Sequence, residues 1–189
     1  MSLKMLTEFA DIVGKLKRVK RSGWLSQVGI ERPESVADHS FRCAVLAMII
    51  SDLSNGNAEK LIRMMLLHDI QEAITGDFDS HTKKQLGIHK VRSQQKSAFR
   101  DILSILPPKL RSQYRSLWAE VQAQKTTEAI LAYDIDKIEM VIQALEYEKE
   151  GYDSSKLDVF WENTESTIKT PLIQNLFHFL LSLREDERL

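Results

Sequence analysis

The feature that most constrains the fold of this chain is how rarely its backbone is interrupted. Only seven glycines and four prolines occur in 189 residues, and these residues most often end or bend helices. Between them, apolar residues recur at helical spacing, and we find no alternation typical of β-strands. The sequence therefore predicts an all-α fold, a single-domain helical bundle over residues 1–189. Its core is expected at about 30–145, flanked by N- and C-terminal helices.

Start and stop signals place the helices along the chain. The first carries Leu6, Phe9 and Ile12 on one face, and the second begins near Ser35, which forms a Ser-x-x-Asp start signal with Asp38. Further helices are expected at 58–75, from about 90 to 106, and at 109–124, 126–150 and 171–184, with a loop at 76–90.

Composition and charge exclude several classes of protein. Apolar residues make up 43% and charged residues 28%, with a net charge of −1, so the chain lacks the basic field of a general nucleic-acid binder. We expect no nucleic-acid polymer as a partner, and a local cluster must meet any anionic ligand. The single cysteine, Cys43, excludes an internal disulfide framework and suits the reducing cytoplasm. The sequence has neither a signal-peptide pattern nor an apolar run long enough for a bilayer, so we expect a cytoplasmic protein without a membrane partner.

The most informative segment is an apolar stretch, residues 61–67, that ends in the adjacent pair His68 and Asp69. A carboxylate on the buried side of a helix is unfavourable by several kcal/mol unless a partner compensates it. Imidazole nitrogen and carboxylate oxygen together suit Mn, Co, Zn, Fe or Ni. Glu72 falls on the same helix face one turn later, where it can handle a proton. Taken alone, the pair is better explained as two satisfied polar residues in a core.

Acidic and imidazole groups also interrupt apolar helices elsewhere in the chain. His39 lies in the helix that begins at Ser35, and Asp134 and Asp136 lie within the core-forming segment 126–150. A core rarely tolerates so many polar side chains unless they converge. Asp134 and Asp136 are separated by about 200° around a helix, so only one of them can face a shared site. Helix geometry leaves open which one does.

Four motif blocks carry a family resemblance. They are residues 16–24 (LKRVKRSGW), 32–40 (RPESVADHS), 68–77 (HDxxEAxxGD) and 136–140 (DKIEM). Together they resemble the HD-domain metal-dependent phosphohydrolases, and more closely the HD-domain 5′-deoxynucleotidases, including the HD domain-containing protein 2 group. The resemblance extends from about residue 4 to about residue 180 in motif order and helix spacing.

The resemblance implies a metal centre. His39, His68, Asp69 and Asp136 would hold one divalent ion per chain, which could be Mn, Co, Zn, Fe or Ni. Asp136 is selected over Asp134 because it is the aspartate that precedes Lys-Ile-Glu-Met.

The resemblance also implies catalytic and binding roles. Glu72 would be the acid/base, acting with Asp69 and with Arg21, whose planar guanidinium suits phosphate oxygens. Substrate would contact Arg21, Trp24, His39, Asp77 and Asp136. Trp24 could equally be a core or interface aromatic, and the loop after Asp77 departs from many relatives. His81 and His89 are expected to be exposed loop residues, and His178 a packing or surface residue.

The implied reaction is hydrolysis of a deoxyribonucleoside 5′-monophosphate to deoxyribonucleoside and phosphate, by an enzyme that is a homodimer. Two alternatives stay open at this level. One is an HD-type phosphohydrolase that acts on a cyclic nucleotide, a nucleoside triphosphate or an alarmone. The other is a metal-stabilised helical interaction module without catalysis.

Overall fold

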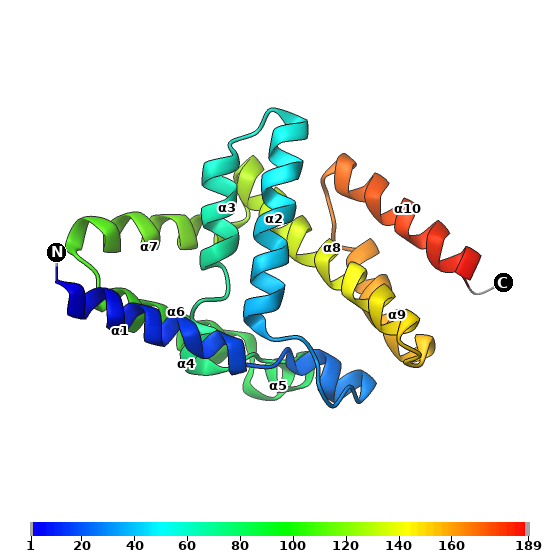
Figure 1. The fold of residues 1–189 in the computed structure, drawn as a ribbon, viewed down its shortest axis with the longest axis horizontal. Coiled ribbons are helices and arrows are strands. Elements are labelled where there is room, and N and C mark those ends of the chain that lie inside the picture. Colours follow the sequence, from blue (N-terminus) through cyan, green and yellow to red (C-terminus); the bar gives the residue numbers. More distant parts are fainter. Residues whose placement is uncertain (1, 188–189) are drawn as a thin grey trace.

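The structure, a computed structural model, describes residues 2–187 and is built of helices joined by short turns and loops (Figure 1). Across these residues no β-strand forms, and the only β-type pairing is an isolated bridge between Lys20 and Ser35. The all-α prediction is confirmed. No helix in the same range is long and apolar enough to cross a membrane.

The elements follow one another with short connections. They are α1 (Leu3–Gly14), the 3₁₀ turn η1 (Lys15–Arg18), the π-helical η2 (Trp24–Val28), α2 (Val36–Ser54), α3 (Ala58–Leu67), α4 (Glu72–Thr75), α5 (Ser80–Leu86), α6 (Ile88–Ser104), α7 (Pro108–Ala123), α8 (Thr127–Lys149), α9 (Ser154–Glu165) and α10 (Pro171–Glu187). Figure 1 shows α2, α3 and α8 in the middle, with α1, α6 and α7 on one side and α9 and α10 on the other.

Local hydrogen bonds explain where the central helices begin. At the start of α2, the Ser35 hydroxyl accepts from the Asp38 backbone N–H, while the Asp38 carboxylate accepts from the Ser35 backbone N–H at 2.9 Å. This reciprocal capping box satisfies two donors that a helix start otherwise leaves unpaired. Thr126 caps α8 by accepting from the Ala129 backbone N–H at 3.3 Å.

Three parts of the predicted helix pattern were wrong. The helix expected at 58–75 is split, because three-residue hydrogen bonds, such as Glu72 N–H to the Asp69 carbonyl at 3.0 Å, tighten the chain into a turn after α3. The loop expected at 76–90 contains α5, which begins where the Asp79 side chain accepts from the Thr82 backbone N–H. The short helix α9 was not predicted at all.

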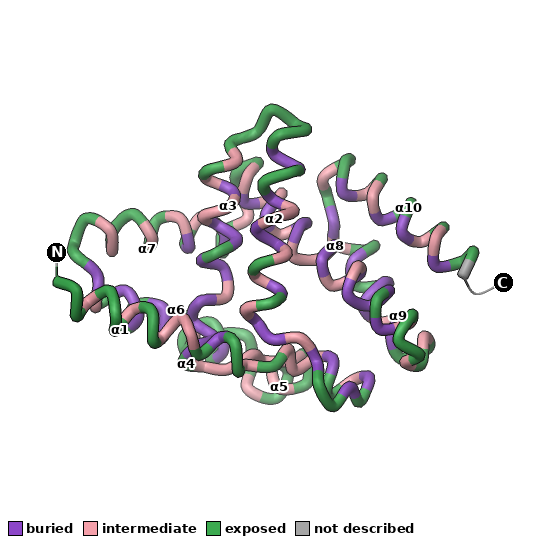
Figure 2. Tube along the Cα trace, viewed as in Figure 1, coloured by how far each residue is buried: buried purple, intermediate pink, exposed green. Residues whose placement is uncertain are grey.

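Two apolar clusters form the interior, and Figure 2 shows the buried residues along the inward sides of the helices. The larger cluster joins α2, α3, α8, α9 and α10, and includes Ile173, Phe177 and Leu180 of the last helix. The smaller cluster joins η1, the start of α2, the end of α3, and α4, α6 and α7, with apolar residues of α1 packed against it. The apolar face of α10 thus completes the core.

Candidate metal centre

Four polar side chains from three parts of the fold meet between the two apolar clusters. The first turn of α2 supplies His39, the turn after α3 supplies His68 and Asp69, and the middle of α8 supplies Asp136. His39 is 0% exposed and His68 6%. The split of the predicted long helix directs His68 and Asp69 together into the interior.

The ligand-type atoms of these residues are close to one another. The His39 Nε2 atom lies 3.1 Å from Asp136 Oδ1 and 3.3 Å from His68 Nε2. His68 Nε2 in turn lies 3.1 Å from Asp69 Oδ2. Donor atoms at about 2.1 Å from one ion are separated by about 3.0–3.4 Å in octahedral or tetrahedral geometry. These three spacings fit neighbouring ligands of one ion, whereas His39 Nε2 and Asp69 Oδ2 are 4.0 Å apart, close to the separation of ligands on opposite sides of an octahedral ion.

The other ring nitrogens are already engaged. His68 Nδ1 donates to the Met65 carbonyl at 2.6 Å, and His39 Nδ1 contacts the Glu139 carboxylate. A neutral imidazole that donates from Nδ1 keeps its lone pair on Nε2. With both rings neutral, as binding of a cation requires, two nitrogen lone pairs and two carboxylates would form a donor set that divalent transition metals accept.

Two other groups of donor atoms near His39 fit an ion less well. The Cys43 sulfur lies 3.6 and 3.8 Å from the two ring nitrogens of His39, and such nearly equal distances place it over the ring face rather than along a lone pair. Burial also raises the pKa of the Cys43 thiol to about 11. In the trio of Glu34, His39 and Glu139, the Glu139 carboxylate is already paired with Arg42, whose Nε lies 2.8 Å from Oε1.

Both predicted carboxylate ligands are held in the ionised form. Burial opposes ionisation of Asp69, but the neighbouring His68 and Arg21 keep its pKa well below the usual aspartate value. For Asp136, burial is likewise outweighed by Lys137, whose Nζ lies 2.8 Å from Oδ2, and by His39. Ionised carboxylates are the form that binds a cation.

Glu72 lies beside this group in a different state. Its side chain is 4% exposed, and among the residues that the structure describes its Oε2 has no hydrogen-bond partner. Burial, and then the charges of Asp69 and Asp77, raise its pKa well above the usual glutamate value. The carboxyl group therefore retains its proton to higher pH than an exposed glutamate, as a general acid requires.

Arg21 and Asp77 form one arrangement at the edge of the site. The Arg21 guanidinium lies 3.6 Å from Asp69 and 3.9 Å from Asp77. One oxygen of Asp77 accepts from the Ser22 backbone N–H at 2.6 Å and from its hydroxyl at 2.9 Å. Asp77 thus ties down the segment that carries Arg21, a task that sequence reasoning did not assign to it.

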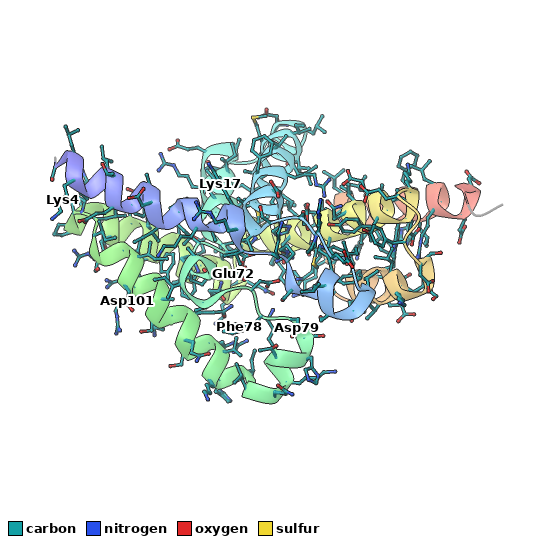
Figure 3. The ribbon with its side chains drawn as sticks, turned by 60° about the horizontal axis from the view of Figure 1, so that its bottom comes forward. Lys4, Lys17, Glu72, Phe78, Asp79 and Asp101 are labelled. Atoms are coloured by element: carbon teal, nitrogen blue, oxygen red, sulfur yellow. The ribbon has the colours of Figure 1, made fainter. Side chains whose placement is uncertain are left out.

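These groups open onto a cavity of about 590 Å³, large enough for a mononucleotide. Figure 3 shows Glu72 in the middle of the molecule, with Phe78 and Asp79 on the loop that leads to α5. The wall includes every predicted site residue except His39, together with three further cations. These residues are Arg21, Trp24, His68, Asp69, Glu72, Asp77 and Asp136, and the cations Lys83, Arg92 and Lys137.

The comparisons with known proteins can now be set beside this geometry. A sequence model of the HD domain matches residues 13–176, most of the chain. The chain belongs to the HD-domain family. Relatives named 5′-deoxynucleotidase HDDC2 are 38% identical in Xenopus laevis and 36% identical in Homo sapiens, and each alignment covers 92% of this chain and 84% or 83% of the relative. A solved structure from Pyrococcus horikoshii superposes with a TM-score of 0.73 at 31% identity, covering 93% of this chain and 96% of that one.

Within this HD domain, the two aspartates of α8 are separated as helix geometry requires. Asp136 faces His39, whereas Asp134 is 0% exposed and points to the start of α10. Its carboxylate accepts from the backbone N–H groups of Lys169 and Thr170, the latter at 2.6 Å. Asp134 is thus a cap that joins α8 to the last helix.

Trp24 lies in the core of the HD domain and also lines the cavity. It is 1% exposed, its ring centroid lies 4.0 Å from that of Phe160, and its indole N–H donates to Glu34 at 3.0 Å. The structure does not bring His81, His89 or His178 to the site, and all three are exposed.

Sequence reasoning missed two polar partners of the HD-domain centre. Glu139 is 0% exposed and contacts His39, and Arg42 donates to Glu139 at 2.8 Å. The available signal was a glutamate three residues after Asp136 in an apolar helix, which puts both carboxylates on one face.

Proposed function

We propose that this HD domain is a metal-dependent 5′-deoxynucleotidase, a phosphohydrolase that converts deoxyribonucleoside 5′-monophosphates to deoxyribonucleosides and phosphate. The observation that carries the proposal is the convergence of donor atoms from His39, His68, Asp69 and Asp136, with successive atoms 3.1–3.3 Å apart, beside the buried Glu72. The relatives named 5′-deoxynucleotidase, of which this chain covers most of the length, support the reaction class.

The ion that fits these donors is Mn, Co, Zn, Fe or Ni, one per chain. When bound, it would neutralise charge on the phosphate and make a water molecule more acidic. A bonding pattern of two imidazoles and two carboxylates does not discriminate among these metals, so availability would decide which is bound.

The remaining steps belong to side chains of this chain. The guanidinium of Arg21 can orient the phosphate with its fork of donors, and Asp77 keeps the Arg21 segment in place through Ser22. Water attacks phosphorus, the bond to the 5′ oxygen breaks, and the protonated carboxyl of Glu72 can supply a proton to that departing oxygen. Because its pKa is raised by burial and by Asp69 and Asp77, Glu72 keeps this proton to higher pH than an exposed glutamate.

Recognition of the deoxyribose is proposed for Trp24 and Asp77. Both line the cavity, and both are fixed in place, Trp24 by Phe160 and Glu34 and Asp77 by Ser22. A rigid wall can disfavour a substrate that carries one additional hydroxyl group, by about 10²-fold at an apolar surface.

We further propose a homodimer and a cytoplasmic location. The outward side of α2 carries Phe41, Met48, Ile49 and Leu53, which are 70%, 43%, 48% and 74% exposed, and an apolar patch of this kind is typical of protein interfaces. The free thiol of Cys43 suits a reducing compartment.

Chelation tests the role of the ion. Treatment with a chelator should abolish phosphate release from deoxynucleoside monophosphates, and added Mn²⁺ or Co²⁺ should restore it while the helical circular dichroism stays unchanged. The variant Asp69→Ala should not be rescued by either ion. Full activity in the presence of excess chelator would refute the proposal.

A further inference from the structure

The buried carboxylate of Glu139 has no role in the proposed reaction, although it lies against the metal centre. Its side chain is 0% exposed, and it contacts His39 Nδ1 with one oxygen and Arg42 with the other. We infer that Glu139 is a positioning residue, which fixes the orientation and the protonated nitrogen of His39 so that Nε2 faces the divalent ion. This rests on the proposed function, because it takes His39 to be a ligand.

One face of α8 contacts both nitrogens of the His39 ring. Asp136 Oδ1 lies 3.1 Å from Nε2, and Glu139, three residues later, contacts Nδ1. Residues three apart lie on the same side of a helix, so α8 holds the imidazole from its two ends. The N–H donated to Glu139 leaves the lone pair of a neutral ring on Nε2.

The two histidines of the centre differ in what orients them. His68 donates from Nδ1 to the backbone carbonyl of Met65 at 2.6 Å, an acceptor that no side-chain substitution removes. For His39 the corresponding acceptor is the side chain of Glu139. Two further polar groups lie near the ring. The Cys43 sulfur, 3.8 Å from Nδ1, lies over the ring face and is a weak acceptor. A carboxylate oxygen of Glu34 lies within 4.8 Å of a His39 nitrogen, but this side chain already accepts from the Trp24 indole N–H. Only His39 thus depends on a replaceable partner.

Arg42 holds Glu139 in this position. It lies three residues after His39 on α2 and donates from Nε to Glu139 Oε1 at 2.8 Å. Its other donors contact Gln143 and both oxygens of Glu146, the latter at 2.7 and 2.8 Å. Because each oxygen of Glu139 faces a different donor, the carboxylate cannot rotate without breaking one contact.

The decisive variant is Glu139→Gln in the full chain. A carboxamide has one acceptor oxygen but would face two donors, from His39 and Arg42. If its NH₂ faces His39, the ring must accept at Nδ1 and carry its proton on Nε2, where the ion binds. We expect the dissociation constant for Co²⁺, measured by its visible absorption during titration, to rise about 10–100-fold, as for other partners of metal-bound histidines.

Glu146→Gln is the matched control. Glu146 contacts the same Arg42, but its side chain is 48% exposed, so this variant should bind Co²⁺ as the wild type does. Equal losses in both variants would show that only the α2–α8 contact was loosened and would overturn the inference, as would unchanged affinity in Glu139→Gln. A wild-type chain that binds no Co²⁺ would refute the proposed function itself, and this inference with it.

A second measurement decides the matter if Glu139→Gln does not fold. Nitrogen-15 NMR of the zinc-loaded wild-type chain, labelled at histidine, reports which nitrogen of His39 carries the proton. The inference requires a proton on Nδ1 and zinc on Nε2. A metal-bound Nδ1 or an unprotonated Nδ1 overturns it.

Discussion

Asp134 and Asp136 lie two residues apart on α8, and we expect their substitutions to have separable effects. Asp134 accepts hydrogen bonds from the backbone N–H groups of Lys169 and Thr170, whereas Asp136 faces His39 and the cavity. Removing Asp134 should lower the stability of the protein without altering its metal centre. Removing Asp136 should weaken metal binding.

The size of the Asp134 effect follows from its contacts. A hydrogen bond to a charged group contributes about 1.5–3 kcal/mol. Asp134→Ala removes the acceptor of two backbone N–H groups, so the free energy of unfolding should fall by about 3 kcal/mol or more. In a chain of this length each kcal/mol shifts Tm by roughly 2–4 °C. We therefore expect the Tm of Asp134→Ala to lie about 6–12 °C below that of the wild type. The Tm of Asp134→Asn, which keeps one acceptor oxygen, should fall by less.

The assays are thermal unfolding by circular dichroism and Co²⁺ titration at a temperature where every variant is folded. Asp134→Ala should bind Co²⁺ like the wild type, and Asp136→Ala should lose more than the roughly 10–100-fold expected for a residue that merely orients a ligand. Loss of Co²⁺ binding in folded Asp134→Ala, or wild-type affinity in Asp136→Ala, would refute the assignment of the two aspartates.

Three further expectations concern catalysis, pH and assembly. Glu72→Gln should lower kcat about 10²–10⁴-fold, as measured by phosphate release, with Co²⁺ affinity retained; a loss below about tenfold would contradict an acid/base role. The pKa of Glu72 is raised in the folded chain, so the unfolded chain gives up this proton at lower pH than the folded chain does. The folded state therefore loses stability as the pH rises above the ordinary glutamate range. In urea denaturation of the metal-free protein, the free energy of unfolding of the wild type, relative to that of Glu72→Gln, should thus fall from about pH 5 to about pH 8. A difference that stays constant over this range would refute the raised pKa of Glu72. Phe41→Asp should turn the proposed dimer into a monomer in light scattering. An unchanged dimeric mass would place the interface elsewhere, and a monomeric wild type would refute the dimer.

Much of the fold could be predicted from the sequence because the helix signals are local. The start of α2 at Ser35 depends on two residues three apart, which form the expected capping box. The missed helix α9 also carries a local signal, since its buried Leu157, Phe160 and Trp161 have helical spacing. The split after α3 has none, because the turn there depends on His68 and its neighbours facing the interior.

The candidate site shows the same division between local and tertiary information. Helix geometry excluded a shared role for Asp134 and Asp136, but only packing shows that Asp134 caps α10. Glu139 is another such case, because a helical glutamate is usually exposed and its contact with His39 spans 100 residues. The extent of the core at 30–145 and the roles of the site residues stay predictions.

The central claim is most directly tested by phosphate release from matched deoxyribo- and ribonucleoside 5′-monophosphates, using protein whose metal content has been measured. We expect release from the deoxyribonucleotides, with a higher kcat/KM than for their ribose counterparts. Protein that carries a full complement of divalent metal and releases no phosphate from any deoxyribonucleoside monophosphate would contradict the account.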